Sequence, residues 1–114
     1  MQDNIIKIDF TQFDGPLYAG RERGLNAAKK INLETLVNDE TKNFIIIIPD
    51  NFYSITSSFF LGMFGKSIKF CKTKENFLNR FNFNNFPDDI KTRLNDWIDR
   101  ALISNNTSYF SDKV

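Results

Sequence analysis

The strongest hydrophobic pattern in the chain is the uninterrupted apolar run from Phe44 to Ile48. A run of large apolar and β-branched side chains of this length is typical of a buried strand. Because neither face of such a strand is polar, we expect it in the middle of a sheet that helices cover on both sides. Pro49 has no N–H to donate to a neighbouring strand, so the strand should end there.

Two other segments alternate between apolar and polar positions, as strands with one wetter face do. Residues 5–10 read Ile-Ile-Lys-Ile-Asp-Phe, and residues 79–84 read Asn-Arg-Phe-Asn-Phe-Asn. The first predicts a strand near the start of the chain, and the second predicts an edge strand. Asp14-Gly15-Pro16 indicates a turn after the first of them.

Residues 21–31 predict the first helix. Gly24 and Ala28 lie one turn apart in it and would let the helix sit close to a sheet. Leu33, Leu36 and Val37 indicate a short helical piece that follows it.

A second helix is expected after the central strand, with Thr56 or Ser57 as its N-cap and with an apolar run that continues to about Phe70. Gly62 and Gly65 interrupt this run. Each glycine costs about 1 kcal/mol relative to alanine inside a helix, which indicates close packing or a break at Gly65.

The last helix is predicted to open at Pro87, followed by Asp88 and Asp89 in its first turn. Its apolar side chains recur at helical spacing and form one stripe: Ile90, Leu94, Trp97, Ile98, Ala101 and Leu102. Alternating strands and helices predict an α/β fold with a small mixed β-sheet packed by helices. We expect one domain over residues 1–114, with a core at about 5–104 and a polar tail at 105–114.

Composition narrows the function classes. The 114 residues carry a net charge of +1, which argues against a mainly electrostatic mode of binding to nucleic acid or anionic lipid. The absence of histidine excludes imidazole-based catalytic triads and zinc sites, and a single cysteine excludes an internal disulfide. We therefore expect no cofactor, no metal and no catalytic activity. No secretory signal and no membrane span are visible, which predicts a cytoplasmic protein. Thirteen phenylalanines predict an aromatic-rich core.

The segment Phe44 to Gly65 joins an all-apolar strand, a short loop and a helix that starts Ser57-Ser58-Phe59. Together with the earlier GRERGLNAAKKI segment, it resembles the STAS-like family of uncharacterised bacterial proteins, related in fold to the STAS domains of anti-sigma-factor antagonists. The resemblance covers about residues 5–104. The antagonists have Asp before the serine pair and Gly after it, where this chain has Thr56 and Phe59.

The resemblance implies a non-catalytic regulatory module that binds a protein partner. It also implies a switch by serine phosphorylation, with a partner histidine-kinase-like ATPase as the kinase. The matching phosphorylation candidate is Ser57, with Ser58 second. A helix N-terminus can accept a phosphate. The phosphate adds a charge of about −1.5 to −2, which would disrupt binding to an apolar partner surface. The expected partner-binding residues are Asp50, Asn51, Phe52, Tyr53, Thr56, Ser57 and Ser58.

Plainer interpretations stand beside these. Ser57 and Ser58 are also an ordinary N-cap pair, and Asp50-Asn51 is also an ordinary turn. Cys71 is expected to be a half-buried small hydrophobe rather than a reactive thiol. An alternative function is a small nucleic-acid or nucleotide-binding protein that uses local basic surface. Its candidate residues are Arg21, Arg23, Lys66 and Lys69, with Lys72 and Lys74 beyond them.

Overall fold

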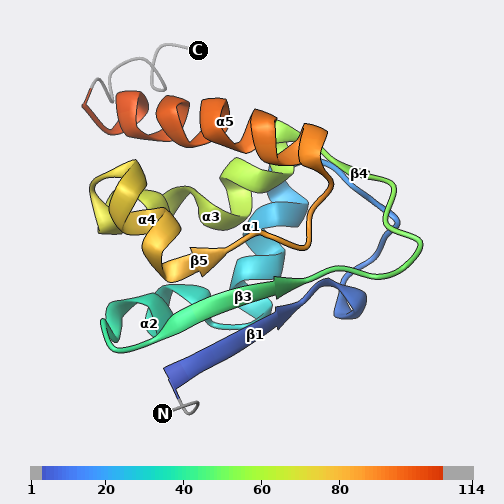
Figure 1. Cartoon of the computed structure of the whole chain (residues 1–114), viewed down its shortest axis with the longest axis horizontal. Coiled ribbons are helices and arrows are strands. Elements are labelled where there is room, and N and C mark those ends of the chain that lie inside the picture. The colour runs from blue at the N-terminus through green and yellow to red at the C-terminus, as the bar shows by residue number, and fades with distance from the viewer. Residues whose placement is uncertain (1–3, 107–114) are drawn as a thin grey trace.

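The computed structural model describes residues 4–106, and their side chains as far as residue 103. Strands and helices alternate along the chain (Figure 1). The elements are β1 (Ile5–Asp9), η2 (Phe10–Gln12), β2 (Leu17–Tyr18), α1 (Arg21–Lys30), α2 (Leu33–Asn38), β3 (Asn43–Ile47), β4 (Ser54–Ile55), α3 (Ser57–Cys71), α4 (Lys74–Arg80), β5 (Phe81–Asn82) and α5 (Asp88–Asn106). The α/β prediction is confirmed. The predicted tail lies outside the described residues from position 107 onward.

The strands form two small sheets, in which every pairing among the described residues is parallel. The larger sheet has the order β1-β3-β5, with β3 in the centre as predicted, and the smaller one pairs β2 with β4. The prediction of a mixed sheet was wrong. Each paired strand is reached through a crossover that carries helices, and such crossovers join parallel strands.

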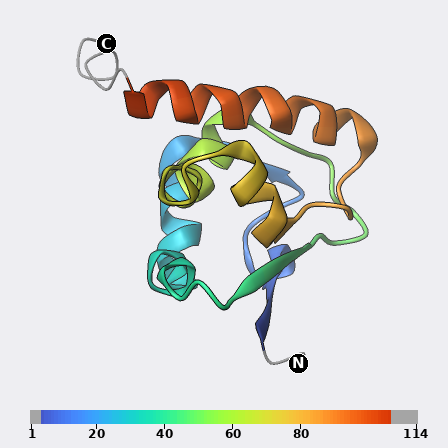
Figure 2. The same cartoon turned by 60° about the vertical axis from the view of Figure 1, so that its left-hand side comes forward.

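Helices cover only one face of the larger sheet. Helices α1 and α3 lie behind the strands in Figure 1, and the turned view in Figure 2 places the strands at one side of the molecule with these helices on the other. The prediction that helices cover both faces of β3 was therefore wrong. Both crossovers advance in the same direction, from β1 to β3 to β5, so right-handed connections place their helices on the same face.

The core is aromatic-rich, as the composition predicted. Phe44 of β3 stacks on Phe81 of β5 with ring centroids 4.5 Å apart, and Phe77 of α4 stacks on Phe81 at the same distance. Edge-to-face contacts link Phe64 to these rings. The buried phenylalanines are Phe10, Phe44, Phe59, Phe60, Phe64, Phe77, Phe81, Phe83 and Phe86.

Glycine governs the crossing of α1 and α3. A Cβ added at Gly24 would lie 2.9 Å from the Met63 amide nitrogen, and one added at Gly62 would lie 3.1 Å from the Arg21 carbonyl carbon. Gly24 therefore brings α1 close to α3, and not to the sheet as predicted. At Gly62 the expected close packing is confirmed. The helix continues without a break through Gly65, where an added Cβ would meet nothing within 4 Å.

Residues 79 and 80 belong to a helix, not to the predicted strand over 79–84. Thr73 caps α4 by accepting a hydrogen bond from the Asn76 N–H at 3.0 Å, and only Phe81 and Asn82 pair with β3. Arg80 ends this helix. Its guanidinium donates to the carbonyl oxygens of Val37, Asp39 and Lys42 at 2.9–3.0 Å. This fork fastens α4 to the connection between α2 and β3.

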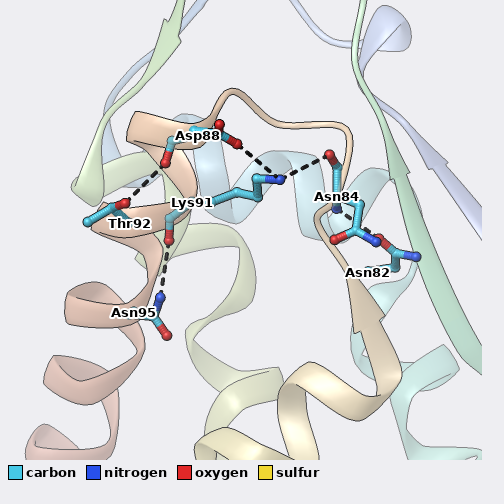
Figure 3. Close-up of polar contacts among 6 residues, drawn as sticks. All are labelled: Asn82, Asn84, Asp88, Lys91, Thr92 and Asn95. Carbon is cyan, nitrogen blue, oxygen red and sulfur yellow. Dashed lines mark hydrogen bonds and ion pairs between the residues drawn. The ribbon is translucent and has the colours of Figure 1, made fainter.

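The last helix, α5, packs on α3 and α4 and begins at Asp88, one residue later than predicted. Figure 3 shows how β5 leads into it. The Lys91 ammonium lies 3.4 Å from the Asp88 carboxylate and 3.5 Å from the Asn84 carbonyl oxygen, which ties the loop to the first turn. Over the described residues, no helix is both long enough and apolar enough to cross a membrane.

Candidate functional site

The predicted partner-binding residues lie at the end of the molecule where the short β2–β4 sheet leads into α1 and α3. Leu17 of β2 pairs with Ser54 of β4, and Tyr18 pairs with Ile55. The Tyr53 N–H donates to the Pro16 carbonyl at 3.0 Å, which continues the pairing by one residue. We call this surface the β2–β4 end; its residues are Leu17, Asp50, Asn51, Tyr53, Ser57 and Ser58.

A single hydroxyl joins the starts of the two long helices. Thr56 is the N-cap of α3, and its Oγ1 accepts from the Phe59 N–H at 3.2 Å. The same oxygen lies 3.4 Å from the N–H of Gly20, the N-cap of α1, whose φ of +96° suits glycine. Of the two N-cap candidates, Thr56 is therefore the one that the structure uses. Its role here is to hold both helix starts beside the β2–β4 sheet.

The serine pair stands in the first turn of α3. Ser57 is half-buried and Ser58 is exposed. Helix geometry leaves their N–H groups without partners inside the helix, because only later N–H groups reach a carbonyl four residues back. A fifteen-residue helix also carries a partial positive charge at this end. A phosphate on the Ser57 hydroxyl would therefore find donors and favourable potential within the same turn.

Two neighbouring aromatic residues point in different directions. Phe52 is half-buried, stacks on Tyr18 with centroids 5.8 Å apart, and meets Phe86 edge-to-face. Tyr53 is 76% exposed. Asp50 and Asn51 are also exposed and lie in the turn that the Phe52 N–H closes on the Pro49 carbonyl. Of the predicted loop residues, Phe52 thus packs against the core, and the others are accessible to a partner.

Leu17 is a surface residue that the sequence did not reveal as a candidate. It is 43% exposed and lies one pairing position from Tyr53, because β2 and β4 run side by side. No local signal could have found it, since a lone leucine before a tyrosine is equally typical of a core position. Pairing between segments far apart in the chain brings the backbones of these two exposed residues close together.

Tyr18 anchors this end from below. It is fully buried, and its hydroxyl donates to the Phe10 carbonyl at 3.2 Å. Burial raises the pKa of the Tyr18 hydroxyl above its ordinary value, although Arg23 opposes the shift. The phenol therefore stays neutral and keeps its proton for the hydrogen bond.

The predicted basic residues do not converge on one surface. Arg23 donates to the carbonyl oxygens of Asp14 and Leu17, so it clamps the loop before β2. Lys66 lies 4.0 Å from Glu34, with both side chains exposed. Lys69 is exposed near the opposite end of α3, and the exposed Arg21 stands in the first turn of α1. Of these residues, Arg23 contacts the β2–β4 end directly through the Leu17 carbonyl, and Arg21 follows the N-cap of α1.

Surface hollows lie beside this end and elsewhere. A cavity of about 250 Å³ opens beneath Arg23 and Lys30, and one of about 200 Å³ lies between α1, α2 and α3. In the first cavity, the Lys30 ammonium donates a hydrogen bond to the Gln12 backbone carbonyl at 2.9 Å. This contact ties the end of α1 to the η2 turn. Among residues 4–106, no cluster of three His, Cys, Asp or Glu side chains could hold a metal ion.

Cys71 lies in a different region, at the end of α3. It is 7% exposed, which is deeper than the half-buried position predicted. Burial raises the pKa of the Cys71 thiol, and the nearby Arg80 only partly opposes this. Most of the thiol is therefore protonated and shielded at neutral pH, which disfavours reactivity.

No protein-family model, curated protein or solved structure gives a significant match to the chain. The resemblance to the STAS-like family thus stays a prediction from the serine-pair segment and the GRERGLNAAKKI helix.

Proposed function

We propose that the chain is a non-catalytic regulatory module of STAS-like type that binds a protein partner through the β2–β4 end. The observation that carries this proposal is the pair of exposed apolar side chains, Tyr53 at 76% and Leu17 at 43%. Tyrosine is enriched where interfaces bind tightly, because it supplies a large rigid ring and one hydroxyl. Asp50, Asn51 and Ser58 are exposed in the same part of the chain and would supply the polar rim of such an interface.

The rigidity of this end supports a binding role. Its strands are held by backbone pairing, its helix starts by the Thr56 hydroxyl, and its underside by the stacked Phe52 and Tyr18. A partner would therefore meet a preformed surface and would lose little conformational entropy on the module's side.

We further propose that phosphorylation of Ser57 switches this binding off. A phosphate there adds about −1.5 to −2 charge to the β2–β4 end, which disfavours an apolar partner surface. Arg21, exposed in the first turn of the neighbouring helix α1, is the cation that would retain the phosphate locally. The kinase implied by the resemblance is a partner histidine-kinase-like ATPase.

The binding surface is tested by partner capture from a lysate of the source organism, with wild-type, Tyr53→Ala and Leu17→Ala baits. Leu78→Ala is the matched control, because Leu78 is 40% exposed but lies on α4, away from this end. We expect the partner on the wild-type and Leu78→Ala baits and not on the other two. A partner captured equally by all four would reject this surface.

The switch is tested with Ser57→Asp, Ser57→Ala and Ser58→Asp baits, followed by mass spectrometry of the chain after incubation with lysate and ATP. We expect phosphate on Ser57 and loss of the partner only with Ser57→Asp. Unchanged affinity of Ser57→Asp would end the switch hypothesis and leave the serines as helix-start residues. Nucleic acid recovered without any protein would favour the alternative function.

A further inference from the structure

The larger sheet has one face that no described element covers. Its side chains come from alternate positions of the three strands: Ile5, Lys7, Asp9, Asn43, Ile45, Ile47 and Asn82. We call this surface the open sheet face. Figures 1 and 2 show the strands at the outside of the molecule, with α1 and α3 on their other side.

Three isoleucines make this face apolar. Ile5 is 52% exposed, and Ile45 and Ile47 are partly exposed. Unlike Ile6 on the opposite face, neither Ile45 nor Ile47 packs against the hydrophobic core. Parallel sheets occur almost only with both faces covered, and their strands are apolar on both sides for that reason. The composition of β3 thus fits a covered strand, and only half of that cover comes from its own helices.

The pairing of β1 with β3 arranges this face in matching rows. Lys7 is paired with Ile45. Two residues further along, Asp9 is paired with Ile47. Each row therefore holds one charged residue on β1 and one isoleucine on β3, and the two charges are of opposite sign.

Such rows complement themselves. Place two copies of the chain with their open sheet faces toward each other, related by a two-fold axis between them. The axis runs parallel to both sheets and perpendicular to the strands, midway between the two rows. It sets Lys7 of each copy opposite Asp9 of the other. It also sets Ile45 of each copy opposite Ile47 of the other. An isologous interface needs this property, in which residue i meets j and j meets i.

We propose that a second copy of the chain covers the open sheet face, stacked with its strands antiparallel around this two-fold axis. Packed sheets lie about 10 Å apart, a distance that a lysine and an aspartate can bridge from opposite sides. The isoleucines then form the dry centre of the interface, and two Lys7–Asp9 ion pairs set its register.

The charged groups are available for this contact. The Asp9 carboxylate accepts two hydrogen bonds on Oδ1, from the Thr11 N–H at 2.9 Å and the Thr11 hydroxyl at 2.7 Å. Its Oδ2 remains open to a lysine. Among the described residues, Lys7 has no ion pair. The β2–β4 end lies outside this interface, so the dimer and the proposed partner binding are independent of each other.

The test is sedimentation velocity of the chain from about 1 µM to about 1 mM, a range in which a weak homodimer dissociates. Lys7→Asp makes the face acidic, and Asp9→Lys makes it basic. We expect a wild-type dimer, a dissociation constant raised about tenfold or more in each variant, and recovery when the two variants are mixed in equal amounts. Recovery on mixing shows that these charges face each other across the interface, and the weakening of each variant alone shows that position 7 meets position 9, because in an interface of 7 with 7 each variant would only exchange one like-charge pair for another.

Lys69→Asp is the matched control, since it makes the same charge change on α3, on the covered side of the sheet. It should dimerise as wild type does. Asp9→Lys also removes the contacts to Thr11, so circular dichroism must show that it folds; if it does not, Lys7→Asp against Lys69→Asp decides alone. A wild-type monomer throughout the range would overturn the proposal and leave the face to another occupant. A dimer that Lys7→Asp does not weaken would also overturn it.

Discussion

Replacing Gly62 by alanine tests the crossing of α1 and α3, which positions the candidate site. The new methyl group would lie 3.1 Å from the Arg21 carbonyl carbon and 3.2 Å from its Cα, and closer still to the carbonyl oxygen. Backbone atoms cannot move aside as a flexible side chain can. The two helices must therefore separate, and the start of α1 must shift relative to the start of α3.

The magnitude follows from two opposing effects. Alanine in place of glycine favours the helix by about 1 kcal/mol. Overpacking a close contact costs about 1–3 kcal/mol, and here the upper part of that range applies because the obstacle is backbone. We expect a net loss of about 1–2 kcal/mol in the free energy of unfolding. For a chain of this size that corresponds to a melting temperature lower by about 4–8 °C.

Gly65 supplies the control three residues along the same helix. An alanine methyl group there meets nothing within 4 Å, so only the helix preference remains. Gly65→Ala should stabilise the chain by about 0.5–1 kcal/mol. Thermal and urea denaturation, followed by circular dichroism, measure both variants. If Gly62→Ala were as stable as Gly65→Ala, the close contact between α1 and α3 would not exist as described.

Four further predictions test other contacts. Thr56→Ala should cost about 1–2 kcal/mol in urea denaturation, and Thr56→Ser should restore most of it, because the serine hydroxyl can accept the same N–H groups; equal loss in both would reject the capping role. Arg80→Lys should cost about 1–3 kcal/mol despite the retained charge, because a lysine cannot reach three backbone carbonyls at once; an unchanged urea midpoint would show that the fork contributes nothing. Cys71 should react with a thiol reagent only as fast as the chain unfolds, because burial raises the pKa of its thiol and shields it; fast labelling of the native chain would contradict its burial. Hydrogen bonds from Thr11 lower the pKa of the Asp9 carboxyl in the folded chain. The ionised carboxylate therefore stabilises the fold above the unfolded pKa of about 4, and this stabilisation is lost as the pH falls through the lower pKa of the folded chain. Asp9→Asn should therefore flatten the acid limb of a stability–pH curve, and an identical limb would exclude this linkage.

Local pattern predicted much of the fold. The apolar run from Phe44 became the central strand, in which Phe44 and Ile46 are buried. The stripe of α5 and the capped start of α3 were equally local, since helical spacing and N-cap chemistry depend on residues within one or two turns. The candidate loop and serine pair were found in the same way.

The alternation of apolar and polar residues over 79–84 predicted a strand that is too long, because such alternation reports which side chains are buried and not which residues pair with another strand. Phe81 and Phe83 are buried while Asn82 and Asn84 are exposed, as a strand would have them. Only Phe81 and Asn82 pair with β3, and the preceding residues gain more from the Thr73 cap and the Arg80 fork at the end of a helix. Both of these contacts depend on the three-dimensional arrangement of α4 against its neighbours.

The sequence by itself determined which segments are apolar, where α1 and α3 begin and that the core is aromatic, because these properties depend on neighbouring residues. Only the tertiary structure decided which surfaces remain exposed. Leu17 is paired with Ser54, the residue after Tyr53, because two distant strands pair. Ile45 and Ile47 stay partly exposed because both crossovers place their helices on one face. Exposure is a property of the assembled chain, since it depends on what lies across a surface and not on what lies next along the chain.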